Sequence, residues 1–185
     1  SNMFEPGIVN RSSDRAHTWF ALGELDGRVT PRLQEIAEIL RAAGKAEIST
    51  NIWGAKWTKL AVNCMTMAFG ALLGITNKEL MQDPRRLELC IKMGKEVMQV
   101  GAALGYKLEP IFGLSAQDFL GSGDEALKKH LGALNSAMST KPISAVRQDY
   151  MKGRSSEVDF LNGLVVRKGK EAKVSTPLNE AIASL

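Results

Sequence analysis

The sequence is poor in the residues from which metal sites and disulfide frameworks are built. Its 185 residues include only two cysteines and two histidines. Cys64 and Cys90 lie in apolar stretches without a CxxC spacing, and His17 and His130 are isolated from each other. We therefore expect two reduced core cysteines, as in a cytoplasmic protein, and no metal site.

Long apolar runs are also missing. The longest run, Met67–Ile75, falls far short of the about 20 apolar residues that a membrane-spanning helix needs. No secretory leader is visible, and Ser1-Asn2 resembles the remnant of a cleaved tag, so we expect an engineered boundary at the start. The sequence therefore predicts no membrane association.

Charge of one sign is not concentrated anywhere along the chain. The formal net charge is +4, from 24 basic and 20 acidic residues. The basic residues form no run of five or six and are not interleaved with aromatic residues, so we expect no nucleic-acid groove. A mild positive balance suits an anionic small molecule equally well.

Residues 1–50 show the pattern of a strand, a helix and a second strand. Thr18–Glu24 is a short apolar segment, and Pro31 stands at the expected first position of a helix. Gly44 is the expected C-cap of that helix, and Ala46–Thr50 is the second candidate strand. Such a β-α-β unit is too small to close a sheet, so we predict the tail of a larger α/β domain.

Residues 51–185 are predicted to be helical. The expected elements are Asn51–Leu73, a short turn from Thr76, Arg85–Gly105, an irregular stretch over 107–123, Asp124–Met138, Thr140–Met151, a helix capped by Ser156, and a last one opened by Thr176-Pro177. Asp159 lies three residues after Ser156, as in a capping box. Glycines in Arg85–Gly105 permit close contact with another helix. The predicted fold is mainly α, with a small β-α-β unit in front.

One stripe of the first long helix breaks its apolar character. The stripe consists of Lys56, Lys59, Asn63, Thr66 and Gly70, spaced by three and four residues. Four residues are just over one turn, so Lys59 and Asn63 point the same way, about 6 Å apart along the axis. A helix apolar on its other sides is buried, so we expect this stripe to face a cleft or a domain boundary. A desolvated Lys59 would be suited to general acid catalysis, although a lysine that only covers apolar surface fits equally well.

Three further motifs allow more than one interpretation. Asn77 is consistent with a helix cap, and Glu157 with an acidic residue in a first helical turn. The segment Gly121–Ala126 matches GxGxxA, but no strand precedes it, and Asp124 and Glu125 stand where a pyrophosphate would bind. We therefore predict that the chain has no nucleotide-binding loop of its own.

The spelling of four motifs in register resembles the ketopantoate reductase family over residues ~50–180. These motifs are Lys59–Cys64 (KLAVNC), Thr76–Leu80 (TNKEL), Gln148-Asp149 followed by Gly153–Gly163 (GRSSEVDFLNG), and Thr176–Asn179 (TPLN). The resemblance implies that residues 1–50 are the remnant of an NADP-binding Rossmann domain. It also implies that residues 51–185 form a helical substrate-binding and dimerisation domain, similar to the C-terminal domain of 6-phosphogluconate dehydrogenase.

The same resemblance implies a chemistry and roles for single residues. The family reduces ketopantoate, a 2-oxo acid of pantothenate biosynthesis, to pantoate with NADPH. Lys59 would be the general acid, Asn63 and Asn77 would bind substrate, and Glu157 would contact the cofactor or a substrate hydroxyl. NADPH would be held mainly by a preceding domain, and a homodimer is expected.

Two positions depart from the family pattern. Met67 stands where a second asparagine is usual, and Ala145 stands where a serine binds the carboxyl side of the substrate; Ser144 is adjacent but would project differently. A related reductase with a more apolar substrate than ketopantoate therefore also fits the sequence. So do a reductase of another class, acting on an imine or oxidising a hydroxy acid, and a helical dimerisation module without chemistry.

Overall fold

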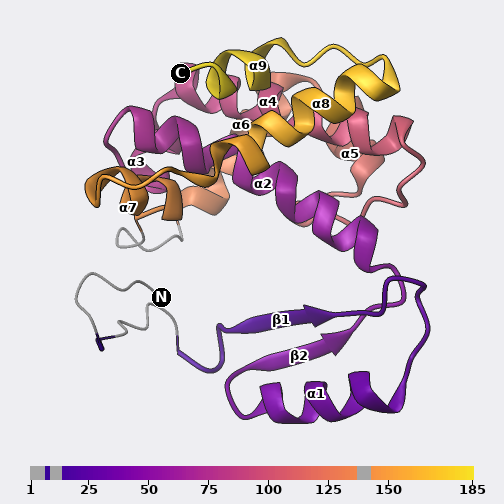
Figure 1. Ribbon diagram of the computed structural model, residues 1–185. Helices are drawn as coiled ribbons and strands as arrows, with labels where there is room; N and C mark the ends of the chain where they lie inside the picture. Colours follow the sequence, from indigo (N-terminus) through magenta and orange to yellow (C-terminus); the bar gives the residue numbers. More distant parts are fainter. Residues whose placement is uncertain (1–6, 9–13, 137–142) are drawn as a thin grey trace. The chain divides into compact units, whose positions relative to one another are not determined.

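The computed structural model of the chain describes residues 7–8, 14–136 and 143–185. It contains two compact units, Ser1–Lys56 and Trp57–Leu185 (Figure 1). The predicted fold class is confirmed, because the described residues are mainly helical and their named strands form a single two-stranded sheet. None of the helices in the described ranges has the length and apolarity of a membrane span.

The smaller unit is a parallel β-α-β unit, as predicted. Strands β1 (Trp19–Leu22) and β2 (Lys45–Ile48) pair in parallel, with Trp19 opposite Lys45. Helix α1 (Pro31–Arg41) connects them and lies along the strand pair (Figure 1). A crossover through a helix is the usual connection between two parallel strands.

The two ends of α1 have different causes. At the start, the Thr30 hydroxyl accepts a hydrogen bond from the Leu33 N–H, and a proline follows as the first helical residue. At the end, the helix stops at Arg41, so the prediction of Gly44 as its C-cap is wrong. A Cβ at Gly44 would lie 2.5 Å from the carbonyl oxygen of Thr18, so glycine is required there by the close approach of the chain to β1.

The larger unit is built around two long helices. Helix α2 (Ile52–Leu72) begins within the smaller unit and continues into the larger one, and α4 is Pro84–Ala103. The other elements are α3 (Asn77–Gln82), α5 (Ala116–Gly121), α6 (Asp124–Ser136), α7 (Ala145–Met151), the 3-10 helix η1 (Glu157–Phe160), α8 (Asn162–Ala172) and α9 (Pro177–Ala183). Helices α8 and α9, drawn in yellow tones, lie side by side and both contact α4 (Figure 1).

The core of the larger unit forms where α2 and α4 approach each other. A Cβ at Gly94 would lie 2.6 Å from the Met65 sulfur, and one at Gly101 would lie 2.3 Å from the Trp57 ring, so the predicted close contact through glycines is confirmed. Helices α3, α5, α6, α7 and α8 add fully buried side chains to this core, among them Leu80, Phe119, Leu131, Val146 and Val165.

Two elements differ from the predicted ones. The stretch over 107–123, expected to be irregular, contains α5, whose start is capped by the Ser115 hydroxyl and whose Phe119 is buried. The helix expected after Ser156 is divided: Ser156 caps only η1 through the Val158 N–H, and α8 starts after Leu161, whose φ and ψ are −103° and −94°. The predicted capping box at Ser156 is therefore wrong.

Two predicted boundaries lie partly outside the described residues. The third helix was expected to reach Met138, and α6 is described as far as Ser136. The fourth was expected to open at 140–142, which the structure does not describe, and α7 starts at Ala145 with Ser144 as its N-cap.

Candidate functional site

The polar stripe of α2 divides into an outward half and a buried half. Lys56 and Lys59 are exposed and Asn63 is half-buried, whereas Thr66 and Gly70 are buried. The Thr66 hydroxyl donates to the Val62 carbonyl of its own helix, so we leave Thr66 out of the candidate site. The first half of the stripe is therefore accessible, and its second half, Thr66 and Gly70, is buried.

The side chains of Lys59 and Asn63 have no partner among the residues that the structure describes. The Lys59 ammonium forms no ion pair or hydrogen bond there, in contrast to Lys95, which bonds Asp124 at 2.8 Å. The side-chain amide of Asn63 likewise forms no hydrogen bond with a described residue. Lys59 is exposed, so its own unit does not desolvate the amine.

Asn77 is not a helix cap. Thr76 caps α3 in a capping box with Glu79, and Asn77 is the first residue of the helix. Its side-chain oxygen Oδ1 is buried and accepts no hydrogen bond from a described residue. A Cβ at Gly70 would lie 3.6 Å from this oxygen, an ordinary contact distance, so the Asn77 side chain lies close to α2 at Gly70. The structure thus brings Asn77 to the helix that carries Lys59 and Asn63.

The carboxylate of Glu79 stabilises the start of α3 through hydrogen bonds from Thr76. The backbone N–H and the hydroxyl of Thr76 each donate to Glu79 Oε2 at 2.8 Å. These hydrogen bonds, the backbone one above all, lower the pKa of the Glu79 carboxyl below its ordinary value. Asn77 is therefore positioned by a charged cap on the residue before it.

Glu157 is half-buried and its carboxylate has no partner among the described residues. It opens the 3-10 helix η1, and because a four-residue helix aligns few peptide dipoles, the dipole explains little of its presence. Five residues later, the Asn162 side-chain N–H lies within 3.5 Å of the Cys64 carbonyl oxygen on α2. The start of α8, five residues after Glu157, therefore lies against α2 at Cys64.

The start of α7 adds an apolar boundary to the same region. The Ser144 hydroxyl donates to the Met67 carbonyl oxygen at 3.1 Å and accepts from the Arg147 N–H at 3.2 Å. These two bonds use the hydroxyl for capping and for attachment to α2. Ala145 follows with an exposed methyl group, and Met67 is half-buried. The Ser144 hydroxyl is thus occupied by bonds within the fold, and the side chains beside it, Ala145 and Met67, are apolar.

A buried polar network in the same unit was not anticipated from the sequence. Glu96 on α4 accepts hydrogen bonds from the backbone N–H groups of Leu178 and Asn179, at 3.0 Å each, at the start of α9. The Asn179 side chain donates to Glu96 at 2.7 Å and accepts from Asn162 at 2.9 Å. Glu96 replaces the cap that the Thr176 side chain does not supply. The sequence signal for this network was Glu96, an acidic residue at a position of its helix that is buried.

The structure agrees with the rejection of Gly121–Ala126 as a nucleotide-binding loop. The segment follows helix α5 rather than a strand, and α6 begins at Asp124.

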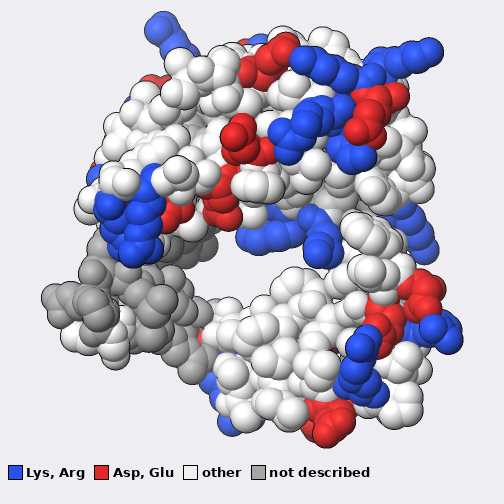
Figure 2. Space-filling view, in the orientation of Figure 1, with Lys and Arg blue, Asp and Glu red and all other residues white. Residues whose placement is uncertain are grey.

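Within the described residues, no group of three His, Cys, Asp or Glu side chains is arranged to hold a metal ion. On the face shown in Figure 2, acidic and basic side chains lie next to one another at several places.

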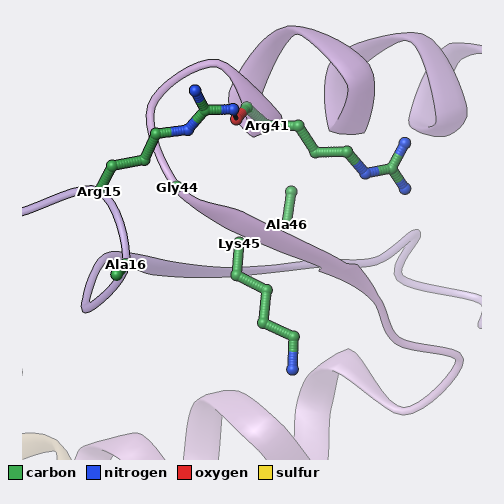
Figure 3. A pocket seen from close by; sticks show the side chains of 6 residues that line it. All are labelled: Arg15, Ala16, Arg41, Gly44, Lys45 and Ala46. Atoms are coloured by element: carbon green, nitrogen blue, oxygen red, sulfur yellow. Dashed lines mark hydrogen bonds between the residues drawn. The ribbon is translucent and has the colours of Figure 1, made fainter.

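A hollow of about 720 Å³ in the smaller unit has basic residues around it, but they do not converge (Figure 3). The Arg15 guanidinium donates to the Arg41 carbonyl oxygen at 2.9 Å and thereby caps the end of α1. Lys45 pairs with Glu47 and Arg41 with Glu38. All three cations are engaged in the fold, so this hollow is not a built phosphate site.

The larger unit is thus a helical domain that presents a lysine and two asparagines without partners among the described residues, and a parallel β-α-β unit precedes it in the chain. Residues 51–185 match the family described as ketopantoate reductase PanE/ApbA C terminal. The chain therefore belongs to this family, which confirms the resemblance seen in its four motifs.

Individual relatives agree with this membership. The 2-dehydropantoate 2-reductase of Archaeoglobus fulgidus is 29% identical over 165 residues, which are 89% of this chain and 50% of that protein. The PanE/ApbA family ketopantoate reductase structure from Ralstonia eutropha JMP134 is 25% identical, has a TM-score of 0.66 and covers 90% of this chain and 49% of its own. A D-mandelate dehydrogenase structure with NADH and anilino(oxo)acetate shares the fold alone, at 18% identity, a TM-score of 0.68, and coverage of 90% and 64%. The chain spans about half the length of the curated relatives it matches.

Proposed function

We propose that this chain is the helical, substrate-binding part of an NADPH-dependent 2-oxo acid reductase, and that Lys59 is its general acid. In this proposal residues 1–50 are the end of the nucleotide-binding domain and residues 51–185 the substrate-binding domain. One observation carries it. Lys59, Asn63, Asn77 and Glu157, from three elements of the larger unit, have no side-chain partner among the described residues.

For Asn77 the lack of a partner is informative, because its Oδ1 is buried and buried polar groups in proteins are usually bonded. Leaving a buried acceptor such as Asn77 Oδ1 without a donor costs about 1–3 kcal/mol. Other polar side chains of the same unit, such as Asn179 and Thr58, are fully engaged. Asn77 Oδ1 is therefore an acceptor that a ligand can use; the Oδ1 atoms of Asn135 and Asn162 and the Nε of Arg86 are likewise buried without a partner among the described residues.

The chemistry assigned to these residues follows from the charge that develops during reduction of a ketone. The nicotinamide cofactor, when bound, supplies a hydride to the carbonyl carbon. Negative charge builds on the carbonyl oxygen, and the Lys59 ammonium stabilises that charge and donates a proton to the oxygen. The product is a 2-hydroxy acid, and the neutral amine regains its proton from solvent. Asn63 and Asn77 hold the substrate by hydrogen bonds.

Cofactor binding needs residues beyond those described. The described residues contain no strand–glycine loop–helix that could hold a pyrophosphate, and only Glu157 is proposed to face the cofactor. The exposed apolar side chains of Met151 and Phe160 support the further proposal of a homodimer. Light scattering of the purified protein would show a monomer if this part is wrong.

A substrate more apolar than ketopantoate is favoured by the start of α7. The Ala145 side chain has no polar atom, and the thioether of Met67 is only a weak acceptor. The Ser144 hydroxyl is already bonded to the Met67 carbonyl oxygen and the Arg147 N–H. A hydroxyl on the substrate would lose a bonding partner there. A panel of 2-oxo acids should therefore show higher kcat/KM for apolar side chains. The change Met67→Asn should move preference towards hydroxylated ones, by about tenfold or more.

The general acid assignment is tested by Lys59→Ala in the full reading frame that contains this chain. Turnover followed at the absorbance of NADPH should fall by about 10²–10⁴-fold. Binding of NADPH should be unchanged, because Lys59 is assigned to the substrate. Lys129→Ala is the matched control: Lys129 is also exposed and unpaired among the described residues, but lies on α6. Near-normal turnover of Lys59→Ala would refute the assignment.

A further inference from the structure

We propose that Thr58 is a positioning residue for the reaction, and that its hydroxyl fixes the turn of α2 from which Lys59 projects. This inference rests on the proposed role of Lys59 and adds a residue that acts through it. It follows from a side chain that ties the backbone before Lys59 to a distant segment of the same unit.

The Thr58 side chain is 6% exposed and makes two reciprocal hydrogen bonds with one residue of another segment. Its hydroxyl donates to the Glu109 carbonyl oxygen at 3.2 Å and accepts from the Glu109 N–H at 3.1 Å. Both bonds go to backbone atoms 51 positions away in the chain. Since a β-branched side chain has few rotamers, these bonds fix the position of the backbone as well as that of the hydroxyl.

Trp57, one residue earlier, fixes the same turn from another side. Its indole N–H donates to the Val97 carbonyl oxygen on α4 at 2.8 Å. Its ring packs on Tyr106 with centroids 5.1 Å apart, and it passes so close to Gly101 that a Cβ there would clash. Two consecutive side chains thus attach this turn to α4 and to the segment that follows it.

The placement of this turn matters for Lys59, because no other described residue holds the Lys59 side chain. The Lys59 side chain is exposed and has no partner among the described residues, so its ammonium reaches a substrate from wherever its backbone is placed. A displacement of about 1 Å in a reacting group can cost about 10²-fold in rate. The hydroxyl of Thr58 therefore affects turnover through the place of Lys59, without touching substrate.

The test compares two buried threonines of the same helix. Thr58→Val removes the hydroxyl that reaches Glu109, whereas Thr66→Val removes one that bonds only within α2; Thr66 is 5% exposed. Thr58→Ser restores the hydroxyl. In the full reading frame, Thr58→Val should lower kcat at least tenfold with the KM for NADPH unchanged. Thr58→Ser should recover most of it, and Thr66→Val should stay within about twofold of the parent.

The outcomes separate this inference from the proposed function. If Lys59→Ala abolishes turnover but Thr58→Val behaves like Thr66→Val, the positioning role is overturned and the general acid stands. If Lys59→Ala is active, the proposed function fails first. Should Thr58→Val fold poorly, hydrogen exchange of the Glu109 amide in Thr58→Ser decides. Protection as in the parent supports the inference, and exchange as fast as in an exposed loop overturns it.

Discussion

Asn179→Ala should strongly destabilise the helical unit, because Asn179 is the centre of its buried polar network. The residue is fully buried, and its side chain bonds Glu96 at 2.7 Å, the Met93 carbonyl at 3.2 Å and Asn162 at 2.9 Å. Alanine keeps the backbone N–H that donates to Glu96 but removes all three side-chain bonds. The Asn162 amide loses a strong acceptor inside the protein.

The magnitude follows from two losses. A hydrogen bond to a carboxylate contributes about 1.5–3 kcal/mol, and leaving the buried Asn162 donor without that acceptor costs about 1–3 kcal/mol. Since neighbouring losses are not additive, we expect the free energy of unfolding to fall by about 3–4 kcal/mol. Asn135→Ala is the matched control. Asn135 is 3% exposed, but among the described residues its side chain makes one hydrogen bond, to the Lys78 carbonyl oxygen, and its Oδ1 has no partner, so we expect a loss of about 1 kcal/mol.

Urea unfolding of the 185-residue chain, followed by circular dichroism of the helices, measures both losses. Most helices lie in the larger unit, so the signal reports mainly on that unit. The slope of the transition should be the same for parent and variants, since the surface exposed on unfolding does not change. Equal losses for Asn179→Ala and Asn135→Ala would show that membership of the network contributes nothing, and would refute the reasoning.

Two further predictions concern titratable groups. Burial raises the pKa of Cys90 to about 12 and that of Cys64 further, so neither thiol should react with a thiol reagent in the folded chain near pH 8, and both should react in denaturant; rapid labelling of the native chain would contradict the buried placement. The hydrogen bonds to Thr76 lower the pKa of Glu79 in the folded chain. Glu79 therefore adds to the free energy of unfolding at pH values above the ordinary carboxyl range, and this contribution is lost as the pH falls through the pKa of the folded chain. Glu79→Gln should therefore destabilise the chain near neutral pH, by an amount that shrinks as the pH falls below the ordinary carboxyl range and through the folded pKa of Glu79; a difference independent of pH in urea titrations would count against this.

Periodicity and helix-start signals predicted the elements whose causes are local. The β-α-β unit, α2, α4 and the proline start of α9 follow from apolar spacing, a prolyl first turn or turn residues, and each was predicted within a few residues. Helix α5 was missed because its six residues carry too few apolar positions for periodicity to show. Its stability comes from burial of Phe119, which depends on contacts distant in sequence.

The break between η1 and α8 could not be predicted for a related reason. A serine, two acidic residues and apolar residues favour a single capped helix in this stretch. In the structure, Asn162 lies fully buried between Asn179 and α2, and the chain turns at Leu161 to bring it there. The hydrogen bonds of the buried Asn162 amide to α2 and to Asn179 on α9 outweigh the local capping signal at Ser156. Sequence patterns contain no information on such a requirement.

The candidate site shows the same limit, because four asparagines of the recognised motifs look alike in sequence. In the interior, Asn162 donates to Asn179 and Asn179 donates to Glu96, whereas Asn63 and Asn77 accept no hydrogen bond from a described residue. The resemblance implied substrate binding for Asn63 and Asn77, and the contacts add that Asn162 and Asn179 hold the fold. Changes at the first pair should therefore appear in unfolding free energy, and changes at the second pair in kcat and KM.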